Sequence, residues 1–146
     1  MKKNSVIILA VVLFVAGFQI VTTRFYSLAG NKIIPLEINS NIFHVEVVDN
    51  SQKMQKGLGG KNGICERCGM LFVFPRSGKY AFWMKDMKFP LDLIWISQGR
   101  VVHIEKNIQP DFQGTLFPSE DADKVLEVNA GSIDSLEIKT GDTISF

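Results

Sequence analysis

The chain has 146 residues, with 16 lysine and arginine residues against 15 acidic residues and a formal net charge of +1. This length allows one domain plus an appendage. The two signs of charge are interspersed along the sequence, which excludes the basic stripe that a nucleic-acid-binding protein presents. Eleven phenylalanines, together with many isoleucines and valines, favour strands over helices.

The N-terminal segment differs in composition from the rest of the chain. Lys2 and Lys3 precede an apolar run from Val6 to Phe18, which is the order of charge and hydrophobicity found in export signals. Two interpretations of residues 1–29 stay open. One is a signal peptide cleaved after Ala29, and the other is an uncleaved hydrophobic helix that anchors the chain in the membrane with both lysines inside. Either one predicts a secreted or cell membrane-anchored protein whose domain lies outside the cytoplasm.

Residues 30–41 are predicted to form a juxtamembrane linker with an edge strand at 33–38. Pro35 fits such a strand because proline cannot donate to a hydrogen-bond ladder and is tolerated at a sheet edge. The β domain is predicted to span residues 42–146.

The domain consists of short strand-like segments separated by glycine- and proline-containing turns, which is typical of an antiparallel sandwich or barrel. Short helices are predicted over 52–56 and 132–136, and a turn at 75–78. A long surface loop is predicted over 107–123. The predicted strands are 43–47, 70–74, 80–85, 91–97, 101–106, 125–129 and a last one after Asp142. The predicted fold is therefore mostly β: an antiparallel sandwich-like or barrel-like single domain with one or two short helices, preceded by an N-terminal hydrophobic helix.

Cys65 and Cys68 are spaced as C-x-x-C. Outside the cytoplasm this spacing favours a disulfide, while a redox-active pair and half of a zinc site remain as alternatives. A zinc site would need His44 and His103, the two histidines of the sequence. Both histidines alternate with apolar residues, which is typical of solvent-facing strand positions. We therefore predict no metal and no cofactor.

The segment 80–96 places charged residues inside apolar sequence, where they are rare unless they have a partner or a function. Trp83 and Lys85 have the same strand parity and should share one face. One interpretation is a cleft with an aromatic wall and fixed charges that binds a sugar or a small anionic group. The other is a Lys85–Asp92 ion pair under Trp83 that only stabilises the fold. The candidate ligand-binding residues are Trp83, Lys85, Asp92 and Glu127, with Gly69 and Met70 near the floor of the site.

Glu127 lies in a short apolar strand-like segment and shares a face with Asn129. With Asp92 it is a candidate for the acid–base pair that glycan hydrolysis requires. The sequence shows no Ser-His-Asp pattern, nucleophile elbow, phosphate-binding loop or zinc-protease motif.

Several short motifs occur in an order and spacing that carry a family resemblance. They are Lys56-Gly57-Leu58, Gly69-Met70-Leu71-Phe72-Val73-Phe74, Phe82-Trp83-Met84-Lys85, Pro90-Leu91-Asp92, Val101-Val102-His103-Ile104, Val125-Leu126-Glu127-Val128-Asn129-Ala130-Gly131 and Gly141-Asp142. With these motifs the chain resembles the domain-of-unknown-function 192 family from about Val45 to Phe146. The resemblance implies a mostly β, sandwich-like single domain that often follows an export signal, and it implies no activity. This chain has Lys56 where the family usually has arginine, and Asp86 where it usually has asparagine.

These observations lead to three hypotheses about function. The first is an extracytoplasmic, membrane-proximal domain that binds a small ligand, glycan or peptide without catalysis, with the membrane as partner through the N-terminal segment. The second is an envelope hydrolase that uses Asp92 and Glu127 as acid and base. The third is a structural or partner-docking domain in which the same residues only stabilise the fold.

Overall fold

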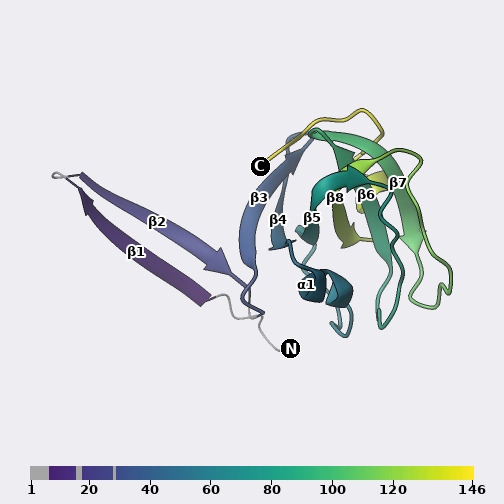
Figure 1. Cartoon of the computed structure of the whole chain (residues 1–146), viewed down its shortest axis with the longest axis horizontal. Coiled ribbons are helices and arrows are strands. Elements are labelled where there is room, and N and C mark those ends of the chain that lie inside the picture. The colour runs from purple at the N-terminus through teal and green to yellow at the C-terminus, as the bar shows by residue number, and fades with distance from the viewer. Residues whose placement is uncertain (1–6, 16–17, 28) are drawn as a thin grey trace.

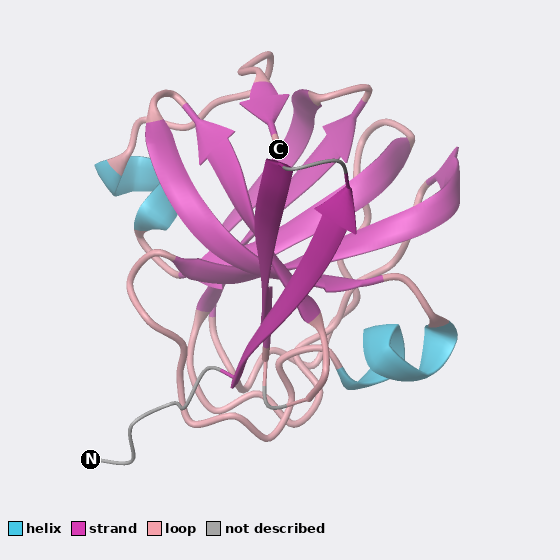
Figure 2. Cartoon of the chain, turned by 90° about the vertical axis from the view of Figure 1, so that its left-hand side faces the viewer, coloured by secondary structure: helices cyan, strands magenta, loops and turns pink. Residues whose placement is uncertain are grey.

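The computed structural model describes residues 7–15, 18–27 and 29–146. The strands and helices are β1 (Ile7–Val15), β2 (Phe18–Tyr26), β3 (Lys32–Ile38), β4 (Asn41–Val48), α1 (Ser51–Lys56), β5 (Cys68–Gly78), β6 (Leu91–Ser97), β7 (Arg100–Ile108), β8 (Ala122–Asn129), α2 (Ser132–Ser135) and β9 (Ile144–Ser145). Strands β3 to β9 form a curled half-barrel, and β1 and β2 form a hairpin that projects from it (Figure 1). The two short helices lie on opposite sides of the strands (Figure 2). The prediction of a mostly β fold with short helices is confirmed.

The sheet is mixed, so the prediction of a purely antiparallel sheet is wrong. Its strand order is β3-β4-β5-β8-β6-β7, with β9 paired to β3. Strands β4 and β5 run parallel, whereas β5–β8, β8–β6 and β6–β7 are antiparallel. Parallel neighbours require a crossover that returns the chain to the same end of the sheet. Residues 49–67, which include α1, form that crossover.

The C-terminal segment covers parts of both edges of the half-barrel. Strand β9 pairs with the end of β3, while the Ile144 N–H donates to the Gly99 carbonyl at 2.8 Å and the Val101 N–H donates to the Asp142 carbonyl at 2.9 Å at the start of β7. Residues 30–41, predicted to be a linker, contain β3 and so contribute to the sheet. Pro35 lies between the β2 and β9 pairings of β3 and has a partner strand only in β4, as expected at an edge.

The N-terminal segment forms the β1–β2 hairpin where the sequence predicts a hydrophobic helix. The two strands pair along their full length, and β2 reaches the domain through two residue pairs with β3. A run rich in valine and isoleucine is compatible with a strand or a helix, and periodicity does not separate the two. Within the described residues, no helix is long and apolar enough to cross a membrane. Lys2, Lys3 and Leu28 lie outside the described residues, so the signal or anchor segment stays a prediction.

Two apolar clusters lie on opposite sides of the sheet because successive residues of β5, β6 and β8 point to opposite faces. The first, which we call the Phe43 cluster, includes Leu36, Phe43, Val45, Leu71, Ile94, Ile96, Leu126, Val128 and Ile133. The second, the Trp95 cluster, includes Val48, Leu58, Met70, Phe72, Phe82, Met84, Leu93, Trp95 and Val125. The central strands are therefore buried on both faces, which explains why the sequence around residues 70–74 is apolar without alternation.

Gly69 is required where β5 and β8 approach each other closely. A Cβ atom at this position would lie 2.7 Å from the backbone oxygen of Glu127 and 3.2 Å from the side chains of Leu126 and Val128. We expect Gly69→Ala to lower the free energy of unfolding by about 2 kcal/mol, because the backbone of β8 must shift to relieve the overlap. Urea denaturation measures this loss. Gly78→Ala is the control, since its Cβ would make only an ordinary contact with Tyr80 at 3.5 Å, and an equal loss in both variants would contradict the explanation.

Candidate ligand-binding cleft

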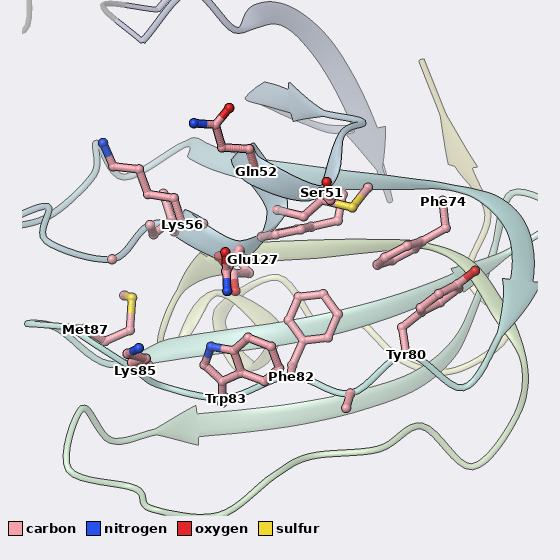
Figure 3. Close-up of a pocket in the computed structure, with 17 residues that line it drawn as sticks. Ser51, Gln52, Lys56, Phe74, Tyr80, Phe82, Trp83, Lys85, Met87 and Glu127 are labelled. Carbon is pink, nitrogen blue, oxygen red and sulfur yellow. The ribbon is translucent and has the colours of Figure 1, made fainter.

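A half-open cleft of about 550 Å³ lies on the Trp95-cluster side of the sheet, between α1 and residues 80–87 (Figure 3). Helix α1 is fixed at both ends by its sequence. The Asn50 side chain accepts the Lys53 N–H at 3.0 Å, and Gly57 ends the helix with φ 49°. Because helix boundaries of this kind are set locally, α1 is held as one wall of the cleft.

Aromatic side chains form the opposite part of the cleft. The rings of Phe74 and Tyr80 stack with centroids 3.6 Å apart, and those of Phe72 and Phe82 meet edge to face at 5.0 Å. The Tyr80 hydroxyl donates to the Arg76 carbonyl at 2.8 Å, which fixes its ring. These contacts give the cleft a preformed apolar wall.

Residues 80–87 were predicted to include a strand over 80–85, and the structure corrects this prediction. In this segment, Phe82 makes an isolated bridge to Leu116 and is not part of a named strand. The chain then turns, with the Met87 N–H donating to the Met84 carbonyl at 3.2 Å. The predicted alternation is confirmed, because Phe82 and Met84 are buried while Trp83 is 48% exposed and Lys85 also faces solvent. Asp86 has φ 59°, a conformation that asparagine and aspartate tolerate better than most residues.

Glu127 is a buried carboxyl group inside this otherwise largely apolar part of the cleft. Only 6% of the residue is exposed, and its Oε2 atom is buried without a hydrogen-bond partner among the described residues. Met70 and Leu93 lie beside it on β5 and β6. Burial raises the pKa of Glu127 to about 8, so the group is mostly protonated at neutral pH. A perturbed carboxyl in a cleft is a candidate for a functional group.

Two lysines lie at the end of the cleft opposite Phe74 and Tyr80. A second hollow of about 470 Å³ adjoins the first and shares Lys56, Trp83 and Lys85 with it. Both lysine side chains are exposed. Figure 3 shows Lys56 and Lys85 at one end and Phe74 and Tyr80 at the other, with Glu127 between them. The cleft therefore has a cationic end, a central carboxyl and an aromatic end.

The structure brings Trp83, Lys85 and Glu127 together but places Asp92 elsewhere. The Asp92 carboxylate accepts the Asn107 N–H at 2.8 Å and the Ile133 N–H at 2.9 Å, on the Phe43-cluster side of the sheet. In the part of the chain that the structure describes, Lys85 and Asp92 form no ion pair. Both oxygens of Asp92 therefore hold the backbone.

Asp92 and Glu127 point to opposite faces of the sheet. Asp92 pairs with Val128, and its neighbour Leu93 pairs with Glu127. Since paired residues point to the same face, the two carboxyl groups do not share a cleft. The acid–base arrangement expected of a glycan hydrolase is therefore not assembled from these two residues.

Gly69 and Met70 lie behind the cleft. Met70 is 2% exposed, belongs to the Trp95 cluster and pairs with Glu127 across β5 and β8. Gly69 pairs with Val128, and a side chain at its position would collide with the backbone of Glu127. Both residues support the position of the carboxyl group from within the sheet.

The cysteines and histidines contribute to the structure outside the cleft. The sulfur atoms of Cys65 and Cys68 are 2.02 Å apart, as in a disulfide, and Asn129 donates to the Cys65 carbonyl at 2.8 Å. His44 is exposed, and the ring of His103 packs against Trp95 at 5.1 Å. The described residues contain no group of histidine, cysteine and acidic side chains able to hold a metal ion.

Sequence reasoning missed the residues that form most of the cleft. The aromatic residues of the wall occur at every second position of their segments, and the sequence of α1 has recognisable caps. Neither signal shows that α1 and the aromatic wall face each other. The missed lining residues are Gln52, Gln55, Lys56, Phe72, Phe74, Tyr80 and Phe82.

The fold and the cleft define a small mixed-β domain with a ligand-sized hollow on one face of its sheet. The chain belongs to the DUF192 family, described as uncharacterized ACR, whose model matches residues 34–146. No functionally curated protein matches its sequence.

Two crystal structures are similar to this chain. A protein of unknown function from Novosphingobium aromaticivorans DSM 12444 has a TM-score of 0.78 and 28% identity, over 82% of this chain and 89% of that one. A protein from Sinorhizobium meliloti 1021, provisionally described as a transcription regulator, has a TM-score of 0.70 and 26% identity, over 84% of this chain and 89% of that one. These similarities support the fold of the domain.

Proposed function

We propose that this protein is a non-catalytic binding protein for a small organic ligand, which enters the cleft between α1 and residues 80–87. The observation that carries the proposal is the buried Glu127 at the centre of a preformed aromatic hollow, whose Oε2 atom has no hydrogen-bond partner in the part of the chain that the structure describes. A volume of about 550 Å³ lies in the range of small-molecule sites, which combine apolar walls with a few polar groups. Trp83, Lys85 and Glu127 would contact the ligand, together with Lys56.

The proposal includes a location outside the cytoplasm, secreted or attached to the membrane through the N-terminal segment. Two features support it. Lys2 and Lys3 precede the apolar run, and the Cys65–Cys68 sulfur atoms lie at disulfide distance, a bond that persists in oxidising compartments.

Trp83 offers a direct test of ligand binding. It is 48% exposed at the cleft, whereas Trp95, the other tryptophan, is completely buried. We expect the emission of Trp83 to change when a ligand enters, and a Trp83→Phe variant to lose that response while its circular dichroism stays native. The measurement is a fluorescence titration of the full chain with a panel of monosaccharides, short peptides, amino acids and aromatic amines.

Phe117→Leu serves as the matched control, because Phe117 is an exposed aromatic residue that does not line the cleft. Its response should equal that of the unmodified protein. If no member of the panel changes either the emission or the melting temperature, the cleft does not bind small molecules of these classes and the proposal is wrong.

A further inference from the structure

The order of polar groups along the cleft limits what a ligand can carry. At the central position, Glu127 offers a carboxyl whose Oε2 atom has no hydrogen-bond donor among the described residues. Around it lie the rings of Phe72 and Phe82 and the backbone of Gly57, where a Cβ would be 3.9 Å from Oε2. A carboxyl in such a place either keeps its own proton or accepts a donor from a ligand.

We propose that the ligand carries an ammonium group next to an apolar group, as apolar amines and amino acids do. The nitrogen donates to Glu127, and the apolar group lies against Phe72, Phe74 and Phe82. This inference rests on the proposed binding function and names the ligand class of the same cleft.

An ammonium group suits this position better than a neutral or anionic group. A buried carboxylate regains part of its lost hydration energy when a cation pairs with it. Hydrogen bonds between ionised partners are about twice as strong as neutral ones. The faces of aromatic rings also attract cations, whereas an anion next to Glu127 would suppress ionisation of both groups.

The two lysines do not oppose this arrangement. Lys56 and Lys85 are exposed at the mouth of the cleft, where solvent screens their charge. They are suited to a carboxylate, as in an amino acid, whose ammonium then faces Glu127. The charge pattern therefore favours a zwitterionic member of the ligand class over a simple amine.

Binding of an ammonium should release the proton of Glu127 to solvent. The titratable or charged side chains that line the same cleft are Lys56 on α1 and Tyr80 and Lys85 in residues 80–87. Strands β5 and β6 present only the apolar Met70, Phe72 and Leu93 to the carboxyl. Because its pKa is raised to about 8 by burial, the ionised fraction of Glu127 rises from about 1% at pH 6 to about half at pH 8. The affinity for an ammonium should increase about 50-fold over this interval.

Isothermal titration calorimetry of the full chain in mild detergent at pH 6 and pH 8 tests the inference. The probes share a phenyl group and differ in charge: phenethylamine, phenylalanine and 3-phenylpropionate. We expect both amines to bind about 50-fold more tightly at pH 8, with release of close to one proton at pH 6, and 3-phenylpropionate to bind at least tenfold more weakly than phenylalanine at pH 8. Glu127→Gln should weaken both amines at least tenfold and abolish the pH dependence.

Two control variants separate the contribution of Glu127 to ligand affinity from that of the two lysines. Glu105→Gln changes a carboxyl outside the cleft and should leave every affinity unchanged. The double variant Lys56→Gln, Lys85→Gln should weaken phenylalanine and leave phenethylamine unaffected.

Each alternative outcome has a distinct meaning. If 3-phenylpropionate or a neutral sugar binds as tightly as phenylalanine at pH 8 with a Trp83 response, or if folded Glu127→Gln binds amines normally, the ammonium inference is wrong while the binding function stands. If no probe of any class binds, both proposals are wrong.

Discussion

The Glu127→Gln variant is expected to be more stable than the unmodified protein at pH 8 and similar to it near pH 4. Burial raises the pKa of Glu127 from the ordinary glutamate value of 4.5 to about 8 in the folded protein. Below pH 4.5 the carboxyl is protonated in both the folded and the unfolded states, so it causes no pH dependence. Between pH 4.5 and 8 only the unfolded state gives up the proton, and stability falls by up to about 1.4 kcal/mol per pH unit.

The total loss is on the order of 5 kcal/mol at most by pH 8. Glutamine does not titrate, so its variant avoids this loss, although its buried amide keeps part of the desolvation cost. Urea denaturation at several pH values between 4 and 8 should therefore show a steeper decline of the free energy of unfolding for the unmodified protein.

Glu46→Gln provides a control in which the stability change at pH 8 has the opposite sign. Burial acts to raise the pKa of Glu46, but hydrogen bonds from Lys61 at 2.6 Å and from Asn31 at 3.0 Å outweigh it, so the pKa lies below its usual value. The stabilisation from Glu46 is present above pH 4.5 and is lost as the pH falls through the lower folded value. We expect Glu46→Gln to be less stable than the unmodified protein at pH 8. If Glu127→Gln also lost stability there, Glu127 would have to be ionised and paired in the folded protein.

Because the buried carboxyl of Glu127 lowers the stability of the fold at neutral pH, folding alone does not explain its position. Replacing Glu127 with an apolar residue would continue the Trp95 cluster across β8, since Met70 and Leu93 already flank it. Sites that bind ligands commonly retain groups that are unfavourable for folding. The free energy of unfolding and the ligand affinity of Glu127→Gln therefore both depend on this one carboxyl group.

Local patterns predicted most strands and helices of the domain, but the predicted strand over 80–85 is absent and the predicted turn at 75–78 is part of β5. Gln52–Lys56 was predicted to be helical from its flanking polar residues and Gly57, and the structure has α1 at Ser51–Lys56. The residues around 91–97 form β6 with the predicted bounds. These elements were predictable because caps, turns and alternation are encoded within a few residues.

Features that depend on pairing between distant segments were not predictable. The parallel β4–β5 pair depends on the direction in which the crossover returns. Asp92 and Glu127 were predicted to share a site, but the register Asp92↔Val128 puts them on opposite faces. A shift of one residue in this register would reverse the outcome, and a single sequence does not specify it. The cleft depends on α1 facing Phe72 and Phe74 across the hollow, which is likewise a long-range arrangement.

Asp92→Ala is expected to lower the free energy of unfolding by about 3 to 5 kcal/mol, one of the largest losses for a single side chain in this domain. The residue is 1% exposed, and its two oxygens accept the Asn107 and Ile133 N–H groups at 2.8 and 2.9 Å. Alanine leaves both donors without partners, at about 1–3 kcal/mol each, and opens a small cavity. For a chain of this size the melting temperature should fall by about 10 °C, measured by differential scanning calorimetry.

Two further variants keep this prediction testable if Asp92→Ala does not fold. Asp92→Asn retains one oxygen acceptor but turns an amide donor toward the other N–H, so it should lose about half as much stability. Asp134→Ala removes an exposed carboxylate whose ion pair with Lys106 lies at the surface, and should change stability by less than about 1 kcal/mol. Folded Asp92→Asn should bind cleft ligands normally, because Asp92 lies on the other face of the sheet from Glu127. If Asp92→Ala and Asp92→Asn were as stable as Asp134→Ala, Asp92 would not hold the backbone. If Asp92→Asn changed the ligand affinity without changing the stability, Asp92 would belong to the binding site.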